Sequence, residues 1–320
     1  MAGYPVGEPR SSGWLPVGEG HELYWEEAGN PDGVPALILH GGPGSGFSES
    51  MRRVFDPATY RIIGFDQRMA KRSRPSAAEP DADLSTNTTW HLVDDIERLR
   101  VFFGVERWVL FGTSWGTTLG LAYAEAHPDR VAAMGFAGVT MTRAEEIDWL
   151  YRGIAPLFPA EWQKFVAHAP PNTPDGALIA AYSDMMFAAD AQVRETAARA
   201  FHDWDNASVS VNPSAGLPSD GVPIERLLSR GRIVTHYFRH HGWLEPGQIL
   251  RDAGRIRHIP TVLVQGRLDM QGPLKTAWDL QQAFPEAELR IIEGAGHSSG
   301  DAGMTEALVD AFDRFASRYI

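Results

Sequence analysis

The hydrophobic positions of this chain form two kinds of pattern that alternate along the sequence. Continuous apolar runs are typical of strands buried on both faces of a sheet, and apolar residues that recur every three or four positions are typical of one face of a helix. The strands predicted in this way cover residues 34–39, 60–65, 107–111, 261–265 and 288–292, and the helices cover residues 89–103, 117–126, 276–284 and 304–319. This alternation predicts an α/β fold with a mostly parallel sheet and helices on both faces.

The pattern changes between residues 142 and 244. Tryptophan-rich helical segments such as EEIDWLYRGIAPLF are separated there by loops that contain proline, and no strong strand candidate occurs. We therefore expect one α/β domain, made of residues 1–141 and 245–320, that is interrupted by a helical insertion of residues 142–244. An insertion of this length is too long for a plain connecting loop, and segments that long usually carry function.

Charge and composition exclude several classes of function. The chain has 29 Lys and Arg residues against 41 Asp and Glu residues, a formal net charge of −12. An acidic surface repels nucleic acids and anionic membranes, so we expect neither as a partner. We find no leader-like start and no apolar run of the ~18 residues that span a membrane, which predicts a cytoplasmic protein. The absence of Cys excludes a thiolate nucleophile and a Cys-based zinc site.

Two stretches match the pattern G-x-S-x-G, in which small residues allow a serine to occupy a strained turn between a strand and a helix. They are residues 112–116 and 296–300. Ser114 follows a predicted strand and precedes a predicted helix, whereas no histidine follows Ser298. Because an acid and then a histidine should follow the nucleophile in this fold, Ser114 is the candidate nucleophile.

The partners of Ser114 are chosen by their place after late strands. Among the histidines after Ser114, His297 alone lies in a glycine-flanked loop, GAGHSSG, directly after a strand. Asp269 follows the strand 261–265, at the sheet edge where open α/β folds place their sites. A neutral imidazole would take the serine proton, and a carboxylate would orient the imidazole. A turn or capping role for either residue is the alternative, and Asp252 and Asp279 are poorer choices for the acid.

The glycine-rich turn HGGPGSG follows the first predicted strand, where it would supply a backbone N–H to an oxyanion. We assign this role to Gly42 and to Trp115, the residue after the nucleophile. We expect the segment Asp66 to Arg68 to brace this loop. A phosphate loop would require a following Gly-Lys-Ser/Thr, which is absent. His236 and His240 have the spacing of a metal face but lack a third ligand, so we expect no metal.

These segments resemble the proline iminopeptidase family of α/β-hydrolases, peptidases that remove an N-terminal residue. The resemblance covers residues 34–300 and rests on HGGPGSG, FDQRMAKRSRPS, NTTWHLVDDIERLR, FGTSWGTTLGLAYAEAHPDRV, EEIDWLYRGIAPLFPAEWQKF, HYFRHHGWL, QGRLDMQGP and GAGHSSG. It implies a helical cap over the serine, the triad Ser114, Asp269 and His297, and neither a metal nor an organic cofactor. We expect a small-molecule or short-peptide substrate and a monomer or small homo-oligomer.

The chain departs from the family pattern near the expected substrate. Met69 and Lys71 stand where the family has glycines. The family's cap carries two glutamates that hold the substrate's ammonium; the first corresponds to Asp205, beside Trp204, and the second to Val234. A buried ammonium needs opposing charge, so we expect weaker binding of free N-termini. The hypothesis is a shift away from the family's substrates, toward another amide, such as an aminoacyl group on a small metabolite, or toward an ester.

Aromatic and charged residues of the insertion are the candidates for substrate contact. The predicted set is Trp204, Asp205, Val234, Tyr237 and Phe238. The predicted activity is hydrolysis of an amide bond that releases an N-terminal aminoacyl group through an acyl-enzyme. Two alternatives stay open: an esterase or thioesterase with the same triad, and a binding protein that retains the fold without catalysis.

Overall fold

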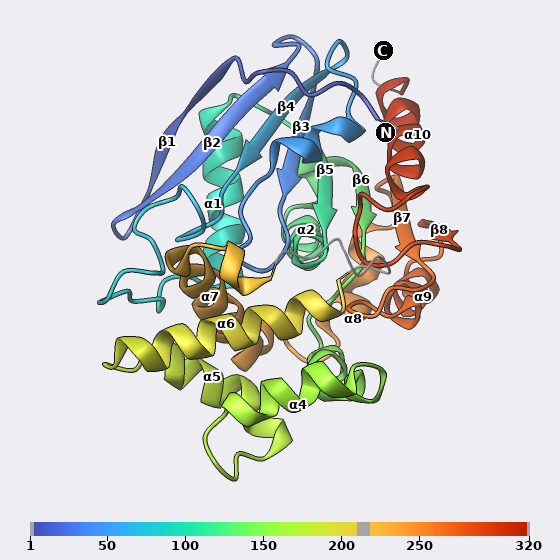
Figure 1. The fold of residues 1–320 in the computed structure, drawn as a ribbon. Coiled ribbons are helices and arrows are strands. Elements are labelled where there is room, and N and C mark those ends of the chain that lie inside the picture. Colours follow the sequence, from blue (N-terminus) through green and yellow to red (C-terminus); the bar gives the residue numbers. More distant parts are fainter. Residues whose placement is uncertain (1–2, 210–217, 319–320) are drawn as a thin grey trace.

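The computed structural model describes residues 3–209 and 218–318, and within them one eight-stranded sheet forms the centre of the molecule (Figure 1). The strands are β1 (Ser11–Gly18), β2 (His21–Gly29), β3 (Val34–Leu39), β4 (Tyr60–Phe65), β5 (Trp108–Thr113), β6 (Val131–Ala137), β7 (Thr261–Gly266) and β8 (Glu288–Ile292). Their order across the sheet is β1-β2-β4-β3-β5-β6-β7-β8. β1 and β2 pair antiparallel, as do β2 and β4, and the pairs from β4 to β8 are parallel.

The α-helices and the short 3-10 and π-helical turns complete the chain. The α-helices are α1 (Thr89–Phe102), α2 (Trp115–Ala126), α3 (Ala144–Asp148), α4 (Pro159–His168), α5 (Leu178–Met186), α6 (Ala191–Ala207), α7 (Ile224–Arg239), α8 (Gln248–Asp252), α9 (Leu274–Ala283) and α10 (Met304–Ala316). The short turns are η1 (Glu49–Val54), η2 (Pro128–Arg130), η3 (Trp149–Gly153), η4 (Ala155–Leu157), η5 (Asp175–Ala177), η6 (Ser219–Gly221), η7 (His241–Trp243) and η8 (Ala253–Ile256).

Helices cover both faces of the sheet. Successive buried residues of a strand point to opposite faces, so both faces are apolar and each packs against helices. Leu37 and Leu39 belong to the layer that contains the buried side chains of α1, α2 and α9. Ala36 and Ile38 belong to the other layer, which contains those of α10. This division follows the period of two along a strand, and it confirms the predicted sheet with helices on both faces.

Three strands were not predicted: two of them lack an apolar run, and the third is built mainly from small residues. β1 and β2 lie at one side of the sheet and mix Gly, Pro and charged residues, with SSGWLPVG and HELYWEEAG as their sequences. β6, with the sequence VAAMGFA, is fully buried, yet its Ala and Gly residues have little strand propensity. The predicted bounds of β3, β4 and β8 agree with the structure, and those of β5 and β7 differ by two residues or fewer.

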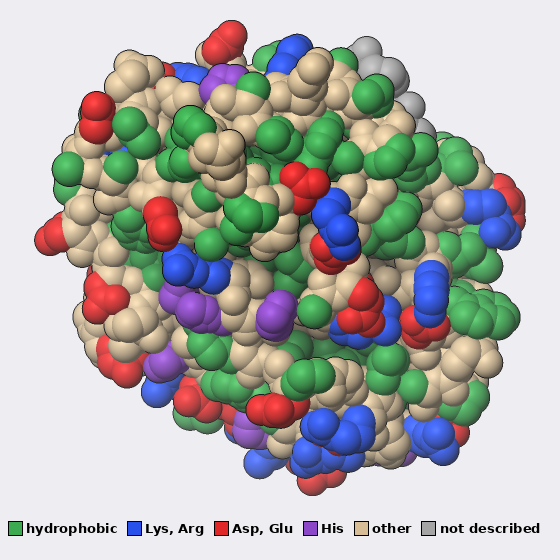
Figure 2. Space-filling model, turned by 90° about the horizontal axis from the view of Figure 1, so that it is seen from below, with side chains coloured by type: hydrophobic (Ala, Val, Ile, Leu, Met, Phe, Trp, Pro, Cys, Tyr) green, Lys and Arg blue, Asp and Glu red, His purple; other side chains and the backbone are tan. Residues whose placement is uncertain are grey.

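The helices α3 to α7 form a separate layer beyond the carboxyl ends of the strands (Figure 1). They have an apolar core of their own, which is rich in aromatic side chains and includes Phe165, Tyr182, Phe201 and Trp204. The segment expected as an insertion, residues 142–244, holds these helices and no strand within its described residues. We call this layer the cap. Figure 2 looks onto the cap side and shows acidic and basic side chains next to each other over its surface.

Among the described residues, no helix combines the length and the apolar character needed to cross a bilayer.

Candidate active site

The turn between β5 and α2 holds Ser114 in a strained backbone conformation, with φ 54° and ψ −123°. Its N–H donates to the carbonyl of Ala137 on β6, at 3.0 Å. The turn tolerates no side chain at its glycines: a Cβ on Gly112 would lie 2.4 Å from the carbonyl oxygen of Gly116, and a Cβ on Gly116 would lie 2.1 Å from that of Leu39. Such strain is found where the surrounding structure holds a functional residue in place.

The loops after β7 and β8 bring a carboxylate and an imidazole together. Asp269 Oδ2 lies 2.8 Å and Oδ1 3.0 Å from Nδ1 of His297. Three other donors hold the carboxylate: the Gln265 side-chain amide at 2.8 Å, and the backbone N–H groups of Gln271 at 2.9 Å and Gly272 at 2.8 Å. Because Nδ1 is engaged with Asp269, Nε2 is the nitrogen of His297 that can accept a proton.

The environment of His297 favours its protonated form. Burial disfavours a charged imidazole, but the charge of Asp269 and its hydrogen bond outweigh burial, so the pKa of His297 lies above its usual value. The ring packs directly against Gly138, where a Cβ would lie 3.1 Å from its atoms. The charge pair and the close packing together fix the orientation of the ring.

Ser114 and His297 line one small cavity of about 50 Å³ beneath the cap. The other described residues of its lining are Gly42, Trp115, Thr140, Thr142, Glu146, Ile147, Leu150, Asp205, Arg230, Phe238 and Gln271. We call it the triad cavity. It brings together most of the residues predicted from the sequence, with Asp269 directly behind His297.

Gly42 and Trp115, the two residues predicted to donate to an oxyanion, both line the triad cavity. Trp115 is the first residue of α2, where helical geometry leaves its N–H without an intrahelical partner. Gly42 lines the cavity at φ 115°, a conformation that favours glycine. Gln67 joins the two loops that carry these residues, since its side chain accepts from Trp115 Nε1 at 2.9 Å and donates to the His40 carbonyl at 2.9 Å. Its backbone N–H also donates to Nε2 of His40, at 3.0 Å.

Asp205 is the predicted cap carboxylate that lines the cavity, and it is already paired. It accepts a hydrogen bond from the Tyr151 hydroxyl at 3.0 Å and forms an ion pair with Arg230 at 2.8 Å. Glu146, a second carboxylate of the cavity, is engaged by Arg143 at 2.5 Å. Its Oε2 accepts from a backbone N–H, and burial raises the pKa of Glu146. The described lining of the cavity therefore includes two carboxylates, each paired with a guanidinium, and of these two guanidinium groups only that of Arg230 also lines the cavity.

The structure places three predicted contact residues away from the described lining of the cavity. Trp204 stacks on Phe165 in the cap core, and Val234 belongs to the same core. The Tyr237 hydroxyl donates to Asn87 at 2.7 Å, and the Tyr237 ring packs edge-on against Trp115. Phe238, by contrast, lines the cavity.

Sequence reasoning missed Glu146, Arg230 and Gln271. Glu146 and Arg230 lie in the helical insertion, whereas Gln271 lies in the loop after β7 and donates to the Asp205 carbonyl. Their position relative to Ser114 depends on how the cap docks on the sheet. The one available signal concerned Arg230, a charged residue without an assigned role that stands next to Gly231 in the stretch SRGRIV of α7.

Met69 and Lys71, which stand where the family pattern has glycines, retain a backbone typical of glycine, with φ 61° and 50°. Met69 is fully buried, and the Lys71 ammonium donates to the carbonyl of Phe47. A left-handed conformation costs an L-residue roughly 1–2 kcal/mol, so both side chains occupy their positions against a local backbone penalty.

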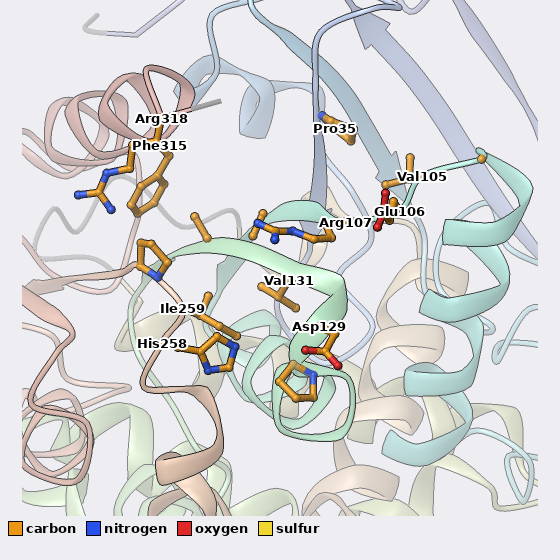
Figure 3. A pocket seen from close by; sticks show the side chains of 15 residues that line it. Pro35, Val105, Glu106, Arg107, Asp129, Val131, His258, Ile259, Phe315 and Arg318 are labelled. Carbon is orange, nitrogen blue, oxygen red and sulfur yellow. The ribbon is translucent and has the colours of Figure 1, made fainter. Parts of the chain in front are cut away.

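A second cavity, of about 960 Å³, lies at the opposite edge of the sheet, where β3, β5, β6 and β7 begin (Figure 3). Its described lining includes Arg107, Asp129, His258 and Arg318 but no serine. Ser114 and His297 both line the smaller cavity instead. Among the described residues, no group of three His, Cys, Asp or Glu side chains could hold a metal ion.

Comparison with known proteins gives consistent results over nearly the whole chain. A family model described as alpha/beta hydrolase fold matches residues 35–302. A proline iminopeptidase of Neisseria gonorrhoeae is 44% identical, with 99% of this chain and 100% of the relative covered. One of Arabidopsis thaliana is 42% identical, with 96% and 80% covered. The crystal structure of a Mycobacterium smegmatis proline iminopeptidase has a TM-score of 0.68 at 18% identity, covers 97% of this chain and 100% of its own, and supports the fold alone.

Proposed function

Because the chain belongs to the alpha/beta hydrolase fold family, and within it to the proline iminopeptidases, we propose that it releases the N-terminal residue of a short peptide or small amide. Proline is the first candidate for that residue. The observation that carries the proposal is the placement of Ser114 and His297 in one cavity, with Asp269 behind the imidazole and the carboxylate of Asp205 in the facing cap wall.

In the proposed mechanism, Ser114 Oγ attacks the carbonyl carbon of the scissile amide while His297 Nε2 takes its proton. The N–H groups of Gly42 and Trp115 stabilise the resulting oxyanion. His297 then gives the proton to the leaving amine, and an acyl-enzyme on Ser114 remains. Water, deprotonated by the same imidazole, hydrolyses this ester and releases the acid. Asp269 holds the tautomer and stabilises the imidazolium throughout.

Recognition of the substrate's amine would rest on Asp205, the cap carboxylate at the position of the family's first glutamate. The second position, Val234, is apolar and lies in the cap core. Arg230 already neutralises Asp205. A substrate ammonium would therefore gain less binding free energy here than from two free carboxylates. This supports the hypothesis of weaker binding of free N-termini and a shift away from the family's substrates.

The test is a panel of prolyl and alanyl anilides, their N-blocked counterparts and simple acyl esters, with Ser114→Ala as the control. We expect free aminoacyl anilides to be cleaved and N-blocking to reduce kcat/KM, with all turnover lost in Ser114→Ala. Turnover of N-blocked amides or esters alone would refute the proposal and favour the esterase alternative.

A further inference from the structure

A third cavity adjoins the triad cavity and shares Asp205 and Arg230 with it. This cavity has a volume of about 560 Å³, and we call it the cap groove. Its described lining includes Lys71, Asp205, Pro223, Glu225, Arg226 and Arg230. Since the triad cavity is small, the cap groove is adjoining space into which the rest of a peptide can extend once its first residue lies at Ser114.

Positive charge gathers in the cap groove although the whole chain is acidic. Lys71, Arg226 and Arg230 line it, against the carboxylates of Asp205 and Glu225. Asp205 is engaged by Arg230. The side chain of Arg226 makes no hydrogen bond or ion pair with any described residue, and Glu225 is exposed. Arg226 is thus a cation of the groove without an ion-pair partner among the described residues, and the Lys71 ammonium donates to a backbone carbonyl.

The start of α7 adds further donors to the cap groove. Its N-cap is Pro223, which offers no side-chain hydrogen bond, and Ile224 follows as the first helical residue. The first backbone N–H groups of a helix have no intrahelical acceptor and carry partial positive charge. Pro223 and Arg226 both line the groove, so the positive end of α7 and a guanidinium face the same space. That combination is suited to an anion.

Lys71 is held in the cap groove at an energetic cost. Its φ of 50° is unfavourable for a residue with a side chain. Burial and the nearby charges of Arg72 and Arg226 lower the pKa of Lys71, although Asp66 opposes this. Like charges that are held together in a groove are stabilised when an anion binds between them, which relieves the repulsion.

We propose that the cap groove is a subsite for the carboxylate of the departing part of the substrate, so that the enzyme prefers short peptides with a free carboxyl terminus. This inference rests on the proposed function. The amino end of the peptide lies in the triad cavity, and the scissile carbonyl lies at Ser114. The carboxylate one or two residues further on lies between Lys71, Arg226 and the start of α7.

The test compares kcat/KM for the dipeptide Pro-Ala with that for Pro-Ala amide, which lacks the carboxylate. We expect the acid to be preferred by about 10-fold or more, the effect of one or two charge-assisted hydrogen bonds. Arg226→Gln and Lys71→Gly should each reduce this ratio toward one. Because the ratio is measured within each variant, a general loss of folding or catalysis cancels, and glycine relieves the strained backbone at Lys71.

The matched control is Arg239→Gln, which removes the same charge from α7 at a residue outside the described lining of the cap groove. This variant should keep the parent's ratio. A parent that cleaves both peptides equally well would refute the subsite and leave the proposed function standing.

A parent that cleaves neither Pro-Ala nor Ala-Ala, in the acid or the amide form, would refute the proposed function instead. The subsite is then decided by protection of Ser114 from a fluorophosphonate label, with Ala-Ala and Ala-Ala amide as probes. Stronger protection by the acid, lost in Arg226→Gln, supports the subsite, and equal protection overturns it.

Discussion

At the scale of single residues, Gln67 joins the two loops that carry the proposed oxyanion donors, Gly42 and Trp115. The amide contacts Trp115 on one side and the loop that leads to Gly42 on the other. In Gln67→Met, which keeps the volume, the backbone bond to His40 stays while both side-chain bonds are lost. We expect kcat to fall by about 10- to 100-fold with little change in KM, since removal of an oxyanion donor itself costs about 100-fold or more.

Steady-state kinetics and thermal unfolding of Gln67→Met separate two roles for this residue. A positioning role lowers kcat in a protein whose Tm is nearly that of the parent. A fall in Tm with an unchanged kcat in the folded enzyme would show that Gln67 only stabilises the loop.

His297 gives the reaction a defined pH dependence. The imidazole must be neutral to accept the serine proton, and its pKa lies above the usual value of about 6.5 because the charge of Asp269 outweighs burial. Activity should therefore increase with pH through a midpoint above that value. In Asp269→Asn the midpoint should move to lower pH and turnover should fall by orders of magnitude. The rate of Ser114 labelling by a fluorophosphonate, followed against pH in the parent and in Asp269→Asn, measures the midpoint and the loss of reactivity. An unchanged midpoint would contradict the role assigned to Asp269.

The candidate triad could be predicted from the sequence because each member follows a strand and the order along the chain is restrictive. Ser114 stands out by its turn, and His297 by its glycine-flanked loop. Arg230 and Glu146 could not be predicted. They belong to helices of the cap, and the apolar pattern of a helix tells which face is buried but not which residue ends above Ser114.

At the scale of elements, α2 contains a buried carboxyl group that has no hydrogen-bond partner among the described residues. Glu125 is buried, neither of its carboxylate oxygens accepts a hydrogen bond from the described part of the chain, and burial together with the charge of Asp252 raises the pKa of Glu125 to about 8. In the unfolded chain its pKa returns to about 4.3. A raised pKa in the folded state means that stability is fully present below the unfolded pKa and is lost as pH rises through 8.

We therefore expect the parent to lose up to about 5 kcal/mol of unfolding free energy between about pH 5 and pH 9 through this group. Glu125→Gln cannot ionise and should lack that part of the loss. Denaturant unfolding of both proteins across this range measures the difference. Parallel stability curves would show that Glu125 is neutral or solvated over the whole range and would contradict the expectation.

The strands show which elements a hydrophobic pattern can predict. β3 and β4 are continuous apolar runs and were predicted with their observed bounds. β6 is buried along its whole length but is built from Ala, Gly and a few larger residues. Small residues fit there because α10 packs closely on that layer: a Cβ on Gly135 would lie 2.4 Å from the ring of Phe312. That requirement comes from the neighbouring helix and is not visible in the strand's own sequence.

At the scale of the whole molecule, the seam between cap and sheet is held by a buried cation. The guanidinium of Arg232 on α7 donates to the carbonyls of Ala77 at 2.8 Å and Glu79 at 2.7 Å in the core, and to that of Met186 in the cap at 3.0 Å. It also lies over the ring of Phe187, 4.4 Å from its centre. The change of sequence pattern between residues 142 and 244 predicted the cap segment. It could not show how the cap is joined to the sheet, because the three acceptors of Arg232 are backbone carbonyls.

Arg232→Met should leave these carbonyls without a donor. Each carbonyl that water cannot reach then costs about 1–3 kcal/mol of unfolding free energy. We expect a loss of several kcal/mol in unfolding free energy and faster proteolysis within the cap. The control Arg239→Met changes the same residue type on the same helix, where the side chain is half exposed and paired with Asp184, and should cost no more than about 1 kcal/mol. A cap that opens alone should lower kcat/KM before global unfolding begins, because the cap supplies Asp205 and Arg230 to the site. Equal stability of Arg232→Met and Arg239→Met would mean that the apolar contacts of the cap, and not this cation, hold the two layers together.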